Sequence, residues 1–161
     1  MRTHSRLAPL ALAAVGAGLV LATSTPASAS DDWHVISGWS GLATKRPTGW
    51  MAYPESPSGP AQAEGWGRVD WTGTDVEVHT GAADRINDGW CAITQLRYHV
   101  KVNGAWKSDW QYRSPAVDCD IDDGQVISKY YASNYPIKDV HFQVCLGWRD
   151  GTTFQCPTNW H

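Results

Sequence analysis

Hydrophobic and polar residues alternate along two long stretches of the chain. In the first stretch, 91–102, one face of an extended backbone would carry Ala92, Leu96, Tyr98, Val100 and Val102, and the other Gln95, Arg97, His99 and Lys101. In the second, one face would carry Val140, Phe142, Val144 and Leu146, and the other Asp139, His141 and Gln143. A period of two is typical of β-strands that are buried on one side. We predict a strand in each stretch.

Shorter segments indicate further strands, at 67–71, 75–79, 105–113, 125–131 and 152–156. No segment after residue 30 shows a long 3.6-residue period. Short strands separated by a turn about every ten residues are typical of antiparallel sandwiches. The pattern therefore predicts an all-β fold, a small antiparallel β-sandwich over residues 65–161 that disulfides stabilise.

The first 29 residues have the pattern of a secretory signal peptide. Arg2 and Arg6 form a basic start, an apolar run follows over 7–22, and Ala27-Ser28-Ala29 resembles a cleavage site. The run is too short for a membrane anchor, and no second stretch could span a bilayer. We expect the protein to be secreted, which makes its four cysteines disulfide candidates.

Two turn signals suggest how the cysteines pair. Asp150-Gly151 indicates a two-residue hairpin turn, and counting outward from it places Cys145 opposite Cys156. A second hairpin is expected at Asn103-Gly104, with Cys91 twelve residues before it and Cys119 fifteen after it. The difference of three residues is consistent with a β-bulge or with a longer connection on the second side of the hairpin. We predict the disulfides Cys91–Cys119 and Cys145–Cys156.

The segment between the signal peptide and the sandwich lacks a strand pattern. We interpret residues 30–52 as an extended arm and residues 53–64, with Pro54, Pro57 and Pro60, as a linker. The arm contains Trp33, Trp39 and Trp50, and exposed apolar rings on an exported chain indicate a partner. The alternative is that the arm adds a strand to the sandwich.

Composition excludes some classes of function. Removal of the signal peptide with Arg2 and Arg6 leaves 11 Lys and Arg and 16 Asp and Glu, so the net charge is negative. A nucleic-acid-binding protein would be expected to have a positive charge. The chain has 10 Trp and only 2 Phe. Tryptophan combines a large apolar area with one polar N–H, so this excess suits interfaces and sugar platforms as well as cores.

The sequence lacks the common motifs of catalysis. It has no Gly-x-Ser-x-Gly turn, no His-Glu-x-x-His helix and no glycine-rich phosphate loop. The histidines are scattered, with no two at metal-ligand spacing. We therefore expect a protein that is not an enzyme and has no cofactor.

Two acidic segments could bind a hard cation such as calcium. One is 118–124, and the other contains Asp84, Asn87 and Asp88. In the first, however, the glycine is not at the EF-hand position and Lys129 stands where a bidentate Glu is needed. Solvated turns are the preferred interpretation of both, and no metal site is assigned.

A sugar site is the alternative to a protein-binding function. Asp70, Asp75 and Glu77 lie near Trp66 and Trp71 on neighbouring expected strands. Acids beside tryptophans on a sandwich face would suit a carbohydrate-binding module or a small glycan-acting hydrolase.

The order of the motifs in the sandwich resembles that of a known family. The motifs are Asp84-x-x-x-Asp88-Gly89-x-Cys91-Ala92, a strand through Tyr98, the Asn103-Gly104-Ala105-Trp106 hairpin, Cys119, and a Val-x-Phe-x-Val-Cys strand followed by a last Cys. They resemble the small exported β-sandwich proteins of Streptomyces and related actinobacteria, most closely the small adaptor subunit of umbrella toxin particles. The resemblance covers about residues 65–161.

This resemblance implies a secreted, non-enzymatic adaptor that links subunits of an extracellular antibacterial toxin complex. The sandwich would dock on a repeat-bearing toxin subunit. The arm would insert into the cleft of a degenerate trypsin-like domain on a lectin subunit. Deletion of 31–52 would then leave a folded sandwich and abolish the complex.

The arm contains residues that suit such a cleft. A trypsin-like pocket binds Lys or Arg through a carboxylate at its base, and Pro47 resists cleavage after Arg46. We expect Lys45 or Arg46 to be the anchor, with Trp39 and Trp50 covering the rim. This assignment is an inference from cleft chemistry, and an ordinary soluble basic stretch is the alternative.

Overall fold

The computed structural model describes residues 32–54 and 60–161, and every regular element in them is a β-strand. The expected signal peptide, residues 1–29, lies outside the described residues. The strands are β1 (Trp33–Ile36), β2 (Thr44–Tyr53), β3 (Ala63–Thr72), β4 (Asp75–Asp84), β5 (Cys91–Val102), β6 (Ala105–Trp106), β7 (Gln111–Asp118), β8 (Val126–Ile127), β9 (Tyr130–Ser133), β10 (Ile137–Gly147) and β11 (Thr153–Gln155).

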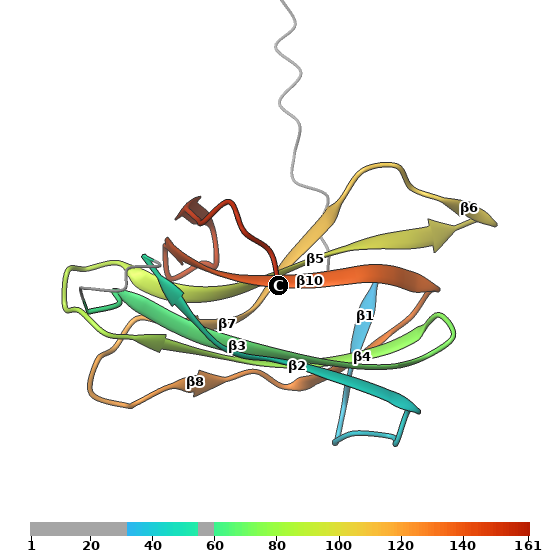
Figure 1. The fold of residues 1–161 in the computed structure, drawn as a ribbon, viewed down its shortest axis with the longest axis horizontal. Helices are drawn as coiled ribbons and strands as arrows, with labels where there is room; N and C mark the ends of the chain where they lie inside the picture. The colour runs from blue at the N-terminus through green and yellow to red at the C-terminus, as the bar shows by residue number, and fades with distance from the viewer. Residues whose placement is uncertain (1–31, 55–59) are drawn as a thin grey trace, which may run out of the picture.

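The strands form two antiparallel sheets that lie on each other as two layers (Figure 1). The first sheet has the order β1-β9-β4-β3-β2, with β8 paired to β4. The second has the order β11-β10-β5-β6, with β7 paired to β5. The predicted all-β sandwich is confirmed.

The core lies between the sheets and uses the faces that alternation predicts. Leu96, Tyr98 and Val100 of β5 and Phe142 and Val144 of β10 are buried there. The layers lie close together where β3 has Gly65 and Gly67 on its inner face. A Cβ atom added at Gly67 would lie 2.5 Å from the ring of Phe142, so this position has room for glycine alone.

The disulfide Cys145–Cys156 forms as predicted, although its hairpin differs in detail. Gly151 N–H donates to the Trp148 carbonyl (2.9 Å) and Trp148 N–H to that of Thr152 (2.8 Å), so the loop has three residues rather than two. The prediction of a turn at Asp150-Gly151 is therefore confirmed in its location, and its length of two residues is wrong. A one-residue register shift after Leu146 compensates. The two cysteines consequently still lie opposite each other.

The disulfide Cys91–Cys119 is also confirmed. The Asn103-Gly104 hairpin has the expected two-residue loop, in which both residues have positive φ, 51° and 81°. The offset of three residues arises in two places. Two residues are taken up between β6 and β7, and one in a bulge of β7 opposite the stretch between Thr94 and Leu96.

The segment expected to be an arm belongs to the sandwich. β1 pairs with β9, and β2 pairs with β3 along most of its length. Trp33 is only 3% exposed and lies edge-on against Tyr98, with 5.2 Å between the ring centroids. Because this ring completes the core, Trp33 does not lie on a free arm, and the added-strand alternative describes the structure.

The expected linker, residues 53–64, is the connection of a hairpin. Tyr53 pairs with Ala63, and Gln62 N–H donates to the Tyr53 carbonyl at 2.7 Å. Residues 55–59 lie outside the described residues. The two ends of the proline-rich segment are thus held together by β2 and β3, so it does not separate two domains.

Several tryptophans lie against cations on the outer faces of the sheets. The guanidinium of Arg97 lies between Trp110 and Trp160, 4.3 and 4.4 Å from the ring centroids. Lys138 lies 4.8 Å from the centroid of Trp106. Such cation–π contacts fix long side chains over a small sheet. They explain part of the tryptophan excess without a ligand.

Candidate interaction surface

The residues proposed from the sequence as partner-binding lie on edge strand β2 and the loop before it. β2 is the last strand of its sheet and has no further strand beside it in the part of the chain that the structure describes. Lys45, Arg46 and Pro47 are exposed, and Trp50 is 57% exposed. An edge strand presents backbone N–H and C=O groups to which a partner's strand can add.

A bulge at Thr48 and Gly49 sets the direction of the side chains on β2. The register shifts by one residue between Pro47 and Trp50, and Gly49 has a φ of 73°. Thr48 Oγ1 accepts a hydrogen bond from Gly67 N–H at 2.9 Å, so the hydroxyl replaces part of the strand ladder. The extra residue turns Met51 into the core and leaves Trp50 on the surface.

The two candidate cations on β2 have different roles. Arg46 donates a 2.7 Å hydrogen bond from Nη2 to the carbonyl oxygen of Val140 on β10, which ties the two sheets together. Lys45 is opposite Asp70 in the register of β2 and β3, next to Arg46, and therefore faces the other side of the strand. Of the two, Lys45 is the cation that a partner could take up without breaking a bond of the fold.

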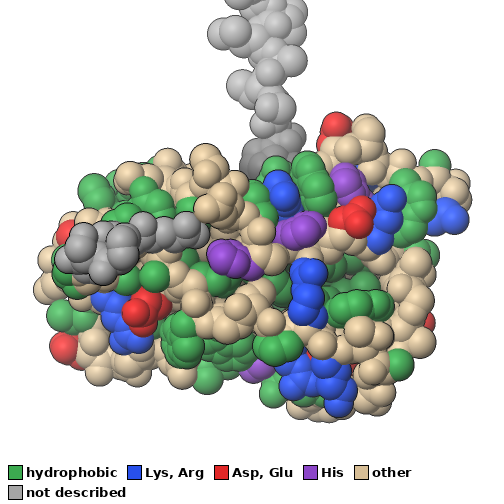
Figure 2. Space-filling view, viewed as in Figure 1, with side chains coloured by type: hydrophobic (Ala, Val, Ile, Leu, Met, Phe, Trp, Pro, Cys, Tyr) green, Lys and Arg blue, Asp and Glu red, His purple; other side chains and the backbone are tan. Residues whose placement is uncertain are grey.

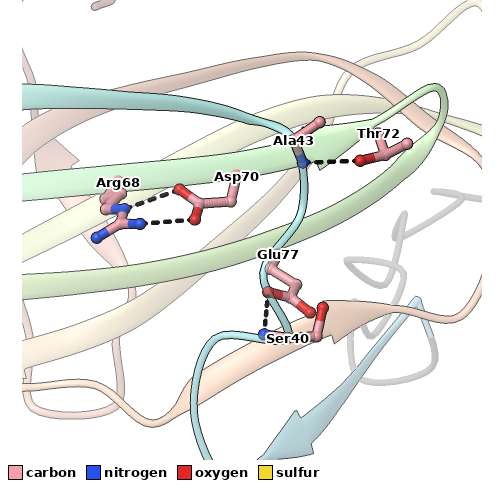
Figure 3. Close-up of polar contacts among 6 residues, drawn as sticks. All are labelled: Ser40, Ala43, Arg68, Asp70, Thr72 and Glu77. Atoms are coloured by element: carbon pink, nitrogen blue, oxygen red, sulfur yellow. Dashed lines mark hydrogen bonds and ion pairs between the residues drawn. The ribbon is translucent and has the colours of Figure 1, made fainter.

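The loop between β1 and β2 is fastened to the outer face of the sheet (Figure 3). Ser40 N–H donates to the Glu77 carboxylate at 3.0 Å, and Ala43 N–H donates to Thr72 Oγ1 at 2.9 Å. The loop therefore has a defined conformation. Because it leads directly into β2, the bonds also fix the start of the edge strand.

Trp39 anchors the same loop through its ring. It lies edge-on to Tyr130 at 5.3 Å, and the guanidinium of Arg68 lies 4.2 Å from its centroid. His79 stacks on Tyr130 at 3.9 Å. Burial lowers the pKa of His79 below its ordinary value of 6.5. Trp39 is thus half-buried in an aromatic group, and Trp50 is the more accessible of the two expected rim residues.

The carboxylates considered for hydrolysis hold structure together. Asp70 and Glu77 are opposite each other on β3 and β4, and both are buried. Asp70 accepts two hydrogen bonds from Arg68, at 2.7 and 2.6 Å, and Glu77 accepts the bond from Ser40 (Figure 3). Asp75 is exposed at the far end of the hairpin. This arrangement favours a structural role for the pair.

The tryptophans expected beside these acids do not form one platform. Trp66 contacts His79 on the outer face of the sheet, with 5.2 Å between the ring centroids. Trp71 packs against the core and lines a cavity between the sheets. Residues five apart on a strand face opposite sides, so one sugar ring cannot contact both.

That cavity has a volume of about 340 Å³ and opens at the edge of the sandwich. Val69, Val76, Ile137 and Val140 form apolar walls, and Arg46 and His141 are on the polar side. Figure 2 shows Lys, Arg and His side chains in the middle and right of the face that it views. Burial, together with the charges of Arg97 and Arg46, lowers the pKa of His141. The cavity adjoins β2, because Arg46 belongs to both.

The acidic segment 118–124 folds as turns. Asp120 N–H donates to Asp118 Oδ1 and Asp122 N–H to Asp120 Oδ1, each at 3.2 Å, so the carboxylates bind the backbone of their own loop. In residues 32–54 and 60–161, no group of three His, Cys, Asp or Glu side chains is arranged to hold a metal ion.

Comparisons with known proteins give no relative: no protein family, no curated protein and no solved structure matches the chain. Residues 32–54 and 60–161 contain no helix that is long and apolar enough to cross a bilayer. The two disulfides indicate an oxidising environment, as found outside the cell.

Proposed function

We propose that the protein is a secreted, non-catalytic adaptor that binds another secreted protein through edge strand β2. The observation that supports this most is the exposed side of the strand, on which Lys45 and Pro47 are accessible and Trp50 is more than half exposed. Large aromatic and cationic side chains are enriched among the residues that dominate binding energy.

The surface suits a cleft with an acidic pocket and an apolar rim. Lys45 would enter the pocket, and the ring of Trp50 would cover the rim. Because Pro47 has no N–H, it limits the addition of a long regular strand and favours a short, specific contact. Arg46 would stay on Val140 and hold the strand in place.

The surface is already ordered in the free protein. The bonds from Ser40 to Glu77 and from Ala43 to Thr72 fix the loop, and pairing with β3 fixes the strand. A segment that is ordered before binding loses less conformational entropy when it binds. This supports binding by an edge of the sandwich in place of insertion of a free arm.

The resemblance described above suggests where such an adaptor acts. We propose an extracellular antibacterial toxin complex, in which β2 contacts a lectin subunit with a degenerate trypsin-like domain. Other surfaces of the sandwich would contact a repeat-bearing toxin subunit. This part of the proposal rests on the order of the sandwich motifs.

Purification of the tagged, full-length protein from culture supernatant tests the proposal. We expect other secreted chains to co-purify with the wild type, and Trp50→Ala and Lys45→Glu to reduce at least tenfold the yield of the chain that β2 binds. Trp106→Ala is the matched control, because Trp106 is an exposed tryptophan on β6 of the other sheet and should leave the yield unchanged. Recovery of the wild type alone would overturn the proposal, as would equal yields with Trp50→Ala.

A further inference from the structure

A second group of exposed aromatic side chains lies away from β2. Phe154 of β11 contacts Trp90 and Trp148, with ring centroids 5.3 and 5.2 Å apart. The exposed fractions are 37% for Trp90, 52% for Trp148 and 44% for Phe154. No Lys or Arg of residues 32–54 and 60–161 lies over the ring of Trp90 or Trp148, unlike the cation-covered tryptophans of the sheet faces. Contiguous exposed rings of this kind mark a binding site.

Trp90 and Trp148 line a cavity of about 260 Å³. Its walls come from the β4–β5, β7–β8 and β10–β11 connections, which lie in the left half of Figure 1. The lining also contains polar side chains of both kinds, acceptors and donors: Asp84, Asn87, Asp120, Asp122 and Arg149. The cavity therefore combines ring faces with hydrogen-bonding groups.

Both disulfides brace this cavity. Cys91 and Cys119 are in its lining, and the bond between Cys145 and Cys156 closes the hairpin from which Trp148 and Phe154 project. The main chain of Trp90 is held as well, since its N–H donates to Asp88 Oδ1 at 2.9 Å. Exposed rings on a cross-linked frame form a site that binds without reorganisation.

We propose that this cavity binds carbohydrate, with a pyranose ring stacked on Trp148 or Trp90 and its hydroxyls bonded to Asn87, Asp120 and Arg149. The apolar C–H face of a sugar needs a flat apolar surface, and its hydroxyls need acceptors and donors at the rim. An apolar ligand would leave the polar lining unpaired, which is costly. The volume lies just below the usual range for small-molecule sites, so it fits one ring of a longer glycan.

The charges in the lining narrow the class of sugar. The lining contains three carboxylates, of Asp84, Asp120 and Asp122, and one guanidinium, of Arg149. An excess of negative charge disfavours acidic sugars and favours neutral or amino sugars. The site is separate from the carboxylate pair of β3 and β4 and requires no hydrolysis. It is also independent of the adaptor function, because none of its lining residues is on β2.

Titration calorimetry of the oxidised, full-length protein against defined oligosaccharides tests the proposal. We expect binding of at least one of the neutral N-acetylglucosamine, glucose or mannose oligomers or of glucosamine oligomers, and none of galacturonate oligomers. Trp148→Ala and Trp90→Ala should each weaken binding at least tenfold. Trp106→Ala, at a tryptophan of β6 with the same exposed fraction as Trp90 and outside the cavity, should leave it unchanged. Because the rings of Trp148 and Trp90 are at the surface, both variants should fold. Peptide mapping without reductant verifies that they keep both disulfides.

Absence of binding to all neutral and amino oligomers at millimolar concentration overturns the proposal. Unchanged affinity in Trp148→Ala and Trp90→Ala, or a preference for galacturonate, also overturns it. A protein partner that is lost from purified complexes in Trp148→Ala, in the absence of glycan binding, identifies the cavity as a protein interface instead. The adaptor proposal fails by a different result, retention of partners by Trp50→Ala.

Discussion

Arg46 of β2 donates a hydrogen bond to the carbonyl oxygen of Val140 on β10, 2.7 Å away, across the open edge of the sandwich. The bond joins the edge strand of one sheet to a central strand of the other. In the register of β2 and β3, Arg46 lies on the opposite face of β2 from Lys45 and Trp50. Of the two cations expected as candidate anchors, Lys45 and Arg46, Arg46 thus ties the two sheets together.

Replacement of Arg46 by Met should therefore affect stability more than Lys45→Met. Loss of a charged donor to a partly accessible carbonyl is expected to lower the free energy of unfolding by about 1 kcal/mol. The Lys45 change should stay within about 0.5 kcal/mol, as for surface substitutions in general. Urea unfolding of the two variants under the same conditions measures the difference, and equal losses would contradict this role of Arg46.

The stability costs of replacing two tryptophans of the N-terminal segment, Trp33 and Trp50, should differ even more than those of Arg46 and Lys45. Trp33→Ala removes a ring buried against Tyr98 and should cost about 3–5 kcal/mol, as large-to-small changes in a core do. Trp50→Ala removes an exposed ring and should cost about 0.5 kcal/mol or less. Thermal unfolding measures both. A stable Trp33→Ala variant would show that β1 is dispensable.

Deletion of residues 31–52 should, for the same reason, unfold the protein. It removes β1, nearly all of β2, and the buried side chains of Trp33 and Met51. The sequence-based expectation was a folded sandwich after this deletion. A cooperative thermal transition and exchange-protected amides in the truncated chain would support that expectation over the structure.

The close approach of the sheets can be tested at Gly67. Its Cβ in Gly67→Ala would meet Phe142, so the variant should lose at least about 1–3 kcal/mol through overpacking. Gly38→Ala is the matched control, because the added methyl group there has nothing within 4 Å. Chemical denaturation of both distinguishes a packing effect from a general cost of replacing glycine.

The lowered pKa of His79 predicts a loss of stability in mild acid. Burial favours the neutral ring in the folded state, whereas the unfolded chain binds a proton near pH 6.5. The unfolded state therefore takes up the proton first, and stability falls as the pH is lowered from about 7.5 through 6.5. His79→Asn should show a smaller fall over this range in urea titrations. A wild-type slope that the substitution leaves unchanged would remove His79 as the cause.

The parts of the fold that sequence predicted depend on local signals. Alternation around Tyr98 and Phe142 continues for several residues because both faces of those strands have constant environments. The Asn103-Gly104 turn and the cysteines fix register over short distances. Together these features predicted the sandwich and both disulfides.

β2 escaped prediction because its own pattern is interrupted. Pro47 and the bulge at Thr48 and Gly49 break the period of two, and the strand lies at an edge where polar residues are tolerated on both faces. The alternation of Met51 and Tyr53 with Ala52 was the remaining signal. Only pairing with β3, which sequence does not reveal, makes the segment a strand.

The aromatic cavity could not be predicted for a different reason. Trp90, Asp120 and Trp148 come from three connections far apart in the chain, and the order of the strands brings them together. The sequence of each connection alone is typical of an ordinary polar turn. The acids near Trp66 and Trp71 were closer in sequence, yet the two rings lie on opposite sides of one sheet.

Photo-crosslinking during secretion tests the role of β2 most directly. A benzophenone amino acid would replace Trp50 or Lys45, and Val35 of β1, exposed on the opposite edge strand of the same sheet, would serve as the control position. The adaptor proposal predicts that positions 50 and 45 capture the same secreted protein and that position 35 does not. Capture at position 35 with none at 50 and 45 would contradict binding through β2.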